Sequence, residues 1–274
     1  MFPFIDTAPR ASPPVVVLGL IVANFAVFVW MQSLPPQLLE ATLVHYALIP
    51  VRYTDPQLAV SVGLDPSNWM PVLTDMFMHG GWMHIIFNMW FLWIFGPALE
   101  ARFGRLGFLA LYLMGGVTAN IVHIATHLDS TEPVLGASGA VAAVIAAYAV
   151  SYPWARVLTI VPIGFIPLFI PVPAFLFAFV WFGLQVLEGS SELASPGMAA
   201  SVAWWAHIGG FVFGAVVALV ARHAPSAPVA PVSAPARTLA PVPGPTMVWR
   251  HANGWRVPDV RRQLPTSNEY RRRI

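Results

Sequence analysis

Six apolar segments, each long enough to cross a lipid bilayer, constrain this chain more than any other feature. A membrane-spanning helix needs about 20 mostly apolar residues, because the hydrocarbon core is about 30 Å thick and each residue rises about 1.5 Å. The segments lie near residues 15–33, 82–99, 106–125, 135–152, 168–187 and 202–221. The sequence therefore predicts an all-α membrane protein that folds as a bundle of six transmembrane helices.

The content of charged residues supports the same class. A soluble globular domain usually carries about a quarter charged residues, whereas 9% of this chain is charged and 57% is hydrophobic. So few charges cannot cover a soluble protein, and the apolar surface must face a lipid bilayer. The chain has no cysteine, which excludes disulfides, a cysteine nucleophile and a cysteine-ligated metal.

Residues 15–223 form the predicted membrane domain, and three parts of the chain do not cross the bilayer. They are a short N-terminal segment, a long first loop and a tail rich in proline and arginine, over residues 1–14, 34–81 and 224–274. The low-complexity tail is expected to be extended and disordered, and no domain in it supports nucleic-acid binding. Residues 157–167 are apolar but short and contain Pro162 and Pro167, so we expect an interfacial loop before the fifth helix.

Arginine residues fall in alternate connections between the predicted helices, which indicates the orientation in the membrane. Connections rich in arginine stay in the cytoplasm. Arg10 precedes the first helix, Arg102 and Arg105 separate the second from the third, and Arg156 follows the fourth. Only Arg52, in the long first loop, breaks the alternation. Both termini are therefore expected in the cytoplasm, and the second, fourth and sixth helices should begin at the outer side.

Four polar residues lie near those outer helix ends. His84 and Asn88 lie near the start of the second helix and, being four residues apart, share one helix face. Ser138 lies near the start of the fourth helix, and His207 near the start of the sixth. Polar side chains inside a bilayer are costly, so each is a functional candidate. We expect the four to converge at similar depth in the outer part of the bilayer.

Small residues surround the serine and follow the last histidine. Gly136 and Gly139 belong to the sequence GASG, and Gly210 and Gly214 form a small-xxx-small face on the sixth helix. Small side chains allow helix backbones to approach closely. The serine and the histidine are therefore predicted to come within hydrogen-bonding distance.

The residue types at these positions indicate acyl-transfer chemistry. A serine hydroxyl is a weak nucleophile until a neighbouring base removes its proton, and His207 can be that base for Ser138. Asn88, His84 and the backbone N–H of Ser138 can donate hydrogen bonds to an oxyanion. No aspartate or glutamate lies at that depth in the three helices, so we predict a dyad rather than a triad.

Four stretches of the chain together resemble the rhomboid family of intramembrane serine proteases. They are HGGWMHIIFNMWFLWIFGPALEARFG (79–104), LYLMGG (111–116), GASGAVAAVIAAY (136–148) and AHIGGFVFG (206–214). The resemblance implies that Ser138 is the nucleophile and His207 the base, with His84 and Asn88 helping to form the oxyanion site. It also implies a six-helix bundle with a water-filled cavity open to the outer face, and a lateral gate made by the fifth helix and its preceding loop.

The resemblance further implies single-span membrane proteins as substrates, cut near helix-breaking residues, with no metal or cofactor. The chain departs from the family at two points. Family members often carry an aromatic residue four positions after the nucleophile, where it can stack on the catalytic histidine, and this chain has Ala142. The Trp-Arg pair common in the family's first loop is also missing.

Several other polar residues are expected to be structural. Glu100 and Arg102 should cap a turn into Gly104, and His79 lies just outside the second helix. Asn120, His123 and His127 should make packing contacts or loop hydrogen bonds. His123 and His127 are four residues apart, but no HExxH motif or nearby carboxylate completes a metal site.

Two competing functions stay open at this point. One is a catalytically inactive rhomboid-like protein that binds membrane helices, and the other is a small channel or transporter, for which no inverted repeat is visible. The short N-terminal segment without a transit peptide favours a bacterial plasma membrane.

Overall fold

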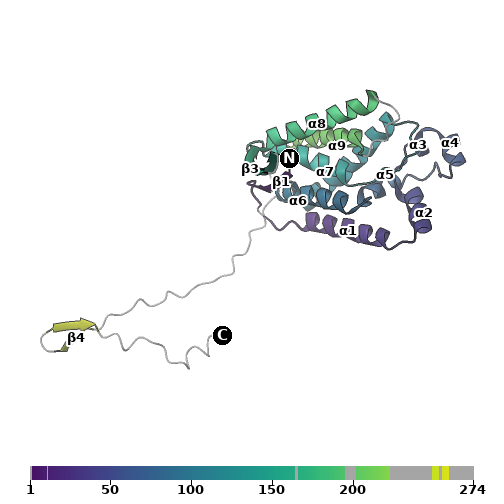
Figure 1. The fold of residues 1–274 in the computed structure, drawn as a ribbon. Helices are drawn as coiled ribbons and strands as arrows, with labels where there is room; N and C mark the ends of the chain where they lie inside the picture. The colour runs from purple at the N-terminus through teal and green to yellow at the C-terminus, as the bar shows by residue number, and fades with distance from the viewer. Residues whose placement is uncertain are drawn as a thin grey trace. The chain divides into compact units, whose positions relative to one another are not determined.

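The computed structural model of the chain describes residues 2–10, 12–163, 166–194, 202–222, 249–252 and 255–258. The chain divides into two compact units, Met1–Val229 and Ala230–Ile274. The first unit is a helical bundle with a small β-sheet (Figure 1).

Long apolar helices make up the bundle. They are α1 (Val15–Gln32), α6 (Trp82–Thr126), α7 (Ser138–Ser151), α8 (Ala174–Ala194) and α9 (Trp204–Ala221). Four of them, α1, α6, α8 and α9, are long and apolar enough to cross a membrane, and α7 is a shorter apolar helix. The chain is therefore a membrane protein with a helical bundle, and a helix overlaps each of the six predicted segments.

Gly104 divides the 45-residue helix α6 into two consecutive helices. Its backbone has φ 72° and ψ 169°, which is not helical. A positive φ of this kind is costly for residues with a Cβ but not for glycine. The break lies between the segments predicted at 82–99 and 106–125, so this part of α6 contains the second and third predicted helices.

Glu100 fastens the start of α1 to the end of the first half of α6. Its two carboxylate oxygens accept hydrogen bonds from the backbone N–H groups of Val16 and Val17, at 3.0 and 2.9 Å. The first N–H groups of a helix have no partner within the helix, so an acidic side chain at this position stabilises α1. Glu100 is therefore structural, as predicted, but it caps the start of α1 and not the expected turn into Gly104.

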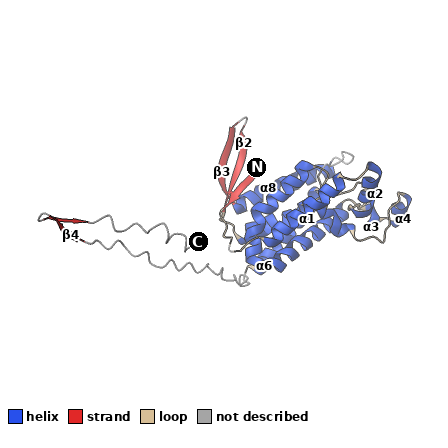
Figure 2. Ribbon diagram, turned by 90° about the horizontal axis from the view of Figure 1, so that it is seen from below, coloured by secondary structure: helices blue, strands red, loops and turns tan. Residues whose placement is uncertain are grey.

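A three-stranded antiparallel sheet corrects two predictions. It consists of β1 (Phe2–Asp6), β2 (Arg156–Ile163) and β3 (Ile166–Pro173), in the order β1-β2-β3 (Figure 2). The predicted helical bundle is confirmed, but the protein is not all-α, and the loop predicted at 157–167 is wrong because strands β2 and β3 occupy its described residues. The fifth helix begins at Ala174 rather than near 168, because β3 occupies the residues before it.

The prolines of the hairpin are compatible with strands because of where they fall. β3 is an edge strand, and its prolines at 167, 171 and 173 are two or four residues apart. Successive backbone N–H groups of a strand point to opposite sides, so the missing donors of all three fall on one side. Proline is tolerated in sheets at such an open edge.

The sheet is fixed to the end of α7 that lies farthest from Ser138. The hydroxyl of Tyr148 donates a 2.6 Å hydrogen bond to the carboxylate of Asp6 in β1, and Arg10 pairs with the same carboxylate. The backbone N–H of Ala174, at the start of α8, donates to the carbonyl of Ala155 at 2.9 Å. The hairpin before the fifth helix therefore begins and ends beside the C-terminal end of α7.

Short helices fill the long first loop, at the other end of the bundle in Figures 1 and 2. They are α2 (Pro36–Tyr46), α3 (Val51–Thr54), α4 (Pro56–Ser61), α5 (Pro71–Thr74) and the 3-10 turn η1 (Asp75–Phe77). Arg52 is 1% exposed and donates hydrogen bonds to the carbonyls of Asp65, at 3.2 Å, and Val44. A buried arginine thus joins distant parts of the first loop.

The second unit contains two short antiparallel strands, β4 (Trp249–Ala252) and β5 (Trp255–Pro258). The sequence did not predict them. The remainder of the predicted disordered tail, and the end of the membrane domain at 223, lie outside the described residues.

Candidate active site

Ser138 is the first residue of α7, the helix at the centre of the bundle. Every residue of α7 from Gly139 to Ala149 is buried, whereas Ser138 itself is partly exposed. No side chain caps the start of α7, and the first N–H groups of a helix have no partner within it. The serine therefore combines a side chain that can be reached with unpaired backbone donors close to it.

Glycine residues on α9 bring that helix against α7. A Cβ atom added at Gly210 would lie 2.0 Å from the carbonyl oxygen of Gly139, and one at Gly214 would lie 2.0 Å from that of Ala143. Any side chain at either glycine would thus collide with backbone. Gly139 is equally tight, since a Cβ there would lie 2.4 Å from Ala119 Cβ on α6. The same Cβ would lie 3.6 Å from the carbonyl oxygen of Ala206, so the first turn of α9 also lies against the first turn of α7.

His207 lies in the first turn of α9, one turn before Gly210, and is 7% exposed. Its Nδ1 atom is 2.7 Å from Oε1 of Gln185 on α8. Its Nε2 atom is buried and has no hydrogen-bond partner among the described residues. No hydrogen bond joins Ser138 to His207 in this part of the chain; such bonds are often long before substrate binds.

Two tryptophans hold the imidazole ring of His207. Its centroid is 5.7 Å from the ring of Trp181 on α8 and 5.9 Å from that of Trp204. Because position 142 is alanine and not an aromatic residue, the sequence did not show which side chain packs against this ring. The structure supplies that support from α8 and from the start of α9 instead of from α7.

His84 and Asn88, on the first turns of α6, face the GASG sequence. A Cβ added at Gly136 would lie 2.7 Å from Nε2 of His84 and 3.8 Å from Nδ2 of Asn88. Gly136 also has φ 132°, where only glycine is at ease. Asn88 is 7% exposed, and its Nδ2 has no hydrogen-bond partner among the described residues. Both side chains therefore lie beside the residues that lead into Ser138.

Asp75 holds the same residues from the first-loop side. Its backbone carbonyl accepts a 3.0 Å hydrogen bond from the N–H of Gly136, and its Oδ1 accepts a 2.7 Å bond from Nδ2 of Asn120. Asn120 also donates to the carbonyl of Val72 at 3.0 Å, so its predicted loop bonds are confirmed. Burial raises the pKa of the Asp75 carboxyl well above its ordinary value, despite the hydrogen bond from Asn120.

Three further histidines lie just before, within and just after α6. His79 is buried and stacks edge-on against His84, with ring centroids 5.1 Å apart. His123 and His127 stack at 4.2 Å, and Nε2 of His127 is 3.2 Å from Oε1 of Glu192. The described residues contain no group of three His, Asp or Glu side chains placed to hold a metal ion.

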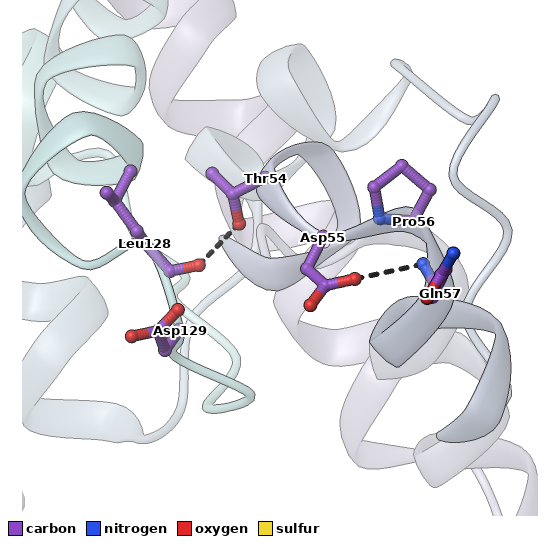
Figure 3. A pocket seen from close by; sticks show the side chains of 6 residues that line it. All are labelled: Thr54, Asp55, Pro56, Gln57, Leu128 and Asp129. Atoms are coloured by element: carbon purple, nitrogen blue, oxygen red, sulfur yellow. Dashed lines mark hydrogen bonds between the residues drawn. The ribbon is translucent and has the colours of Figure 1, made fainter.

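An open surface hollow lies elsewhere, between α3, α4 and the segment after α6 (Figure 3). Its lining residues are Thr54, Asp55, Pro56, Gln57, Leu128 and Asp129. The Thr54 hydroxyl donates to the carbonyl of Leu128, and Asp55 accepts from the backbone N–H of Gln57. None of the predicted site residues lines this hollow.

Sequence reasoning missed Gln185 and Trp181. Gln185 is a polar residue near the predicted outer end of the fifth apolar segment, so the rule that selected the other four polar residues also applies to it. Trp181 carried no such signal, because aromatic residues are common in apolar helices. The implied gate loop needs a correction, since the hairpin before α8 lies at the end of α7 away from Ser138.

Sequence comparison finds relatives of this chain among rhomboid and rhomboid-like proteins. Over 219 residues the chain is 27% identical to RHOMBOID-like protein 12, mitochondrial, of Arabidopsis thaliana, which covers 70% of this chain and 58% of that protein. Over 115 residues it is 30% identical to the rhomboid protein YdcA of Bacillus subtilis (strain 168), which covers 40% of this chain and 57% of that protein. Over 89 residues it is 37% identical to Presenilin-associated rhomboid-like protein A, mitochondrial, of Danio rerio, and this match covers 32% of this chain and 23% of that protein.

These matches span less than two thirds of each relative. The rhomboid domain family itself matches residues 66–224, which is more than half of the chain and contains every predicted site residue. The chain therefore belongs to the rhomboid family.

Proposed function

We propose that this chain is an intramembrane serine endopeptidase that uses Ser138 as nucleophile and His207 as base. One observation carries the proposal: Nε2 of His207 is buried and unpartnered, on a helix turn that touches the start of α7. A buried nitrogen without a hydrogen-bond partner lowers the stability of the fold, so its presence calls for an explanation such as a catalytic role. Accepting a proton from the adjacent serine is such a role.

In the first step, the Ser138 hydroxyl oxygen attacks the carbonyl carbon of the scissile peptide bond. Nε2 of His207 takes the hydroxyl proton as the new C–O bond forms, and the carbonyl oxygen becomes an oxyanion. The imidazolium then gives that proton to the leaving amine, the C–N bond breaks, and an acyl-serine is left. Water, deprotonated by the same nitrogen, hydrolyses the ester and restores the serine.

The oxyanion of the tetrahedral intermediate needs donors that are in place before the reaction. Asn88 suits this role, because its Nδ2 is buried and unpaired among the described residues and lies beside Gly136. Nε2 of His84 lies beside the same glycine. The backbone N–H of Ser138, in the first turn of α7, is a third donor.

We propose six membrane spans with both termini in the cytoplasm. Two α6 segments separated at Gly104, together with α1, α7, α8 and α9, supply the spans. The pairing of β1 with β2 supports the orientation, because it brings the N-terminal segment to the connection that follows α7. Arg10 and Arg156, in those two segments, then share the cytoplasmic side.

The substrates we propose are single-span membrane proteins, cut near the outer side of the bilayer where α7 begins. α8 is the proposed lateral gate. The bacterial plasma membrane is the proposed location, although two of the relatives named above carry mitochondrial names. The lipid bilayer is the remaining partner.

Reconstitution into liposomes with a single-span reporter protein tests the proposal. We expect the wild type to cut the reporter, and Ser138→Ala to leave it intact while unfolding at the same temperature. A folded wild type that retains the reporter without cutting it would instead favour a helix-binding protein.

A further inference from the structure

Gln185 on α8 and His207 on α9 form a buried hydrogen bond that the Ser-His dyad does not include. The two side chains are 6% and 7% exposed, and Oε1 of Gln185 is 2.7 Å from Nδ1 of His207. The other end of the amide is also engaged, since Nε2 of Gln185 is 3.1 Å from the carbonyl oxygen of Trp181, one turn earlier on α8.

These two contacts determine which nitrogen of His207 carries the proton. A backbone carbonyl can only accept a hydrogen bond, so the amide end that faces Trp181 must be the NH₂ group. The end that faces His207 is then the amide oxygen, which can also only accept. Nδ1 must therefore carry a hydrogen, and in the neutral ring Nε2 must carry the lone pair.

The resulting tautomer is the one that a base for Ser138 requires. Nε2 is the nitrogen without a partner among the described residues, and it can accept a proton only if Nδ1 holds the ring hydrogen. Rotation of the ring about its bond to Cβ would break the bond to Gln185. The ring of Trp181, on the same helix as Gln185 and with its centroid 5.7 Å from that of the imidazole, limits that rotation further.

We propose that Gln185 is a positioning residue that sets the tautomer and orientation of His207, and so takes the place of the carboxylate in a catalytic triad. The inference rests on the proposed protease function. In this arrangement α8 helps to prepare the base, although Ser138 and His207 themselves lie on α7 and α9.

The surroundings of His207 contain few groups that compete with Gln185. The titratable side chains near it are His84 and His123, both on α6. α7 carries no charged residue, and on α8 the carboxylate of Glu192 is engaged with His127. No carboxylate in the described residues is bonded to His207, so the neutral amide is its polar partner.

The rate of labelling by a fluorophosphonate probe, measured against pH in detergent, tests the inference. Gln185→Leu removes the acceptor with little change in volume, and we expect labelling to slow about 10²-fold, as for a base displaced by about 1 Å. Gln185→Glu keeps the acceptor and adds charge. We expect it to label close to the wild-type rate, with the acidic limb of its pH profile moved to higher pH, because a carboxylate stabilises the imidazolium.

Leu184→Ala, at an exposed neighbour on α8, is the matched control and should label like the wild type. Thermal unfolding of each variant separates loss of rate from loss of fold. If Gln185→Leu labels at the wild-type rate, or if the Leu and Glu variants are slowed equally, the inference is overturned while the protease proposal stands. If the folded wild type does not label at all, both fall together.

Discussion

The contact between Gly210 and the carbonyl of Gly139 makes Gly210→Ala the sharpest test of how the two helices are placed. The added Cβ would lie 2.0 Å from the carbonyl oxygen and 2.9 Å from the carbonyl carbon. These are backbone atoms, which cannot rotate away as a side chain can. The helices must therefore separate by about 1 Å or more before the atoms reach ordinary van der Waals contact.

Two effects of that separation can be estimated. Overpacking of a tightly packed interior typically costs about 1–3 kcal/mol of stability. The displacement also moves His207, one turn away, relative to Ser138, and an error of about 1 Å in a catalytic arrangement can cost about 10²-fold in rate. We expect Gly210→Ala to unfold at a lower temperature in detergent and to label with a fluorophosphonate probe about 10²-fold more slowly.

Gly183→Ala on α8 is the matched control, because a Cβ there meets no atom within 4 Å. It should retain the wild-type labelling rate and unfold at or above the wild-type temperature, since alanine favours a helix over glycine. If Gly210→Ala is as stable and as fast as Gly183→Ala, the close approach of α7 and α9 is not a feature of the protein in solution.

Three further predictions concern stability, each measured by thermal unfolding in detergent. Glu100→Gln removes the charged acceptor at the start of α1 and should cost about 0.5–2 kcal/mol, the range for a lost helix cap; an unchanged unfolding temperature would contradict the contacts with Val16 and Val17. Arg52→Met leaves two loop carbonyls without their donor and should cost about 1–3 kcal/mol; a neutral effect would show that the first loop does not depend on this side chain. Burial, with a smaller contribution from His84, lowers the pKa of His79 from 6.5 to about 3. Between these pH values the His79 imidazole is protonated in the unfolded chain and neutral in the folded one, so the free energy of unfolding should increase as the pH rises from about 3 to 6.5. His79→Gln should flatten that increase.

The helical part of the fold could be predicted because each apolar segment is a local signal. A run of about 20 apolar residues specifies a spanning helix without reference to the rest of the chain. Gly104 separates the second and third segments for an equally local reason, since glycine alone adopts its backbone conformation without strain.

The sheet could not be predicted in the same way. A short apolar run such as 157–167 is ambiguous between strand, helix and buried loop, and its prolines favoured a loop. The strand forms because β2 pairs with β3 on one side and with β1 on the other. β1 begins at Phe2, which pairs with Ile160. Pairing between such distant segments leaves no mark at either position in a single sequence.

The candidate site was partly within reach of the sequence. Ser138, His84, Asn88 and His207 stood out because polar residues are rare in apolar segments. Gln185 met the same criterion, but its bond to His207 depends on how α8 and α9 pack. The support of the imidazole by Trp181 in place of a residue at 142 is likewise a matter of packing, not of spacing.

The most direct test of the central claim is to label the protein with a fluorophosphonate probe and to identify the modified residue by mass spectrometry. Wild type should carry the label on Ser138, while Ser138→Ala and His207→Ala should remain unlabelled although both still fold, His207→Ala with a lower unfolding temperature because it loses a buried ring and leaves Gln185 without its donor. A folded wild type that stays unlabelled, or that carries the label on another residue, would contradict the assignment of an activated serine at the start of α7.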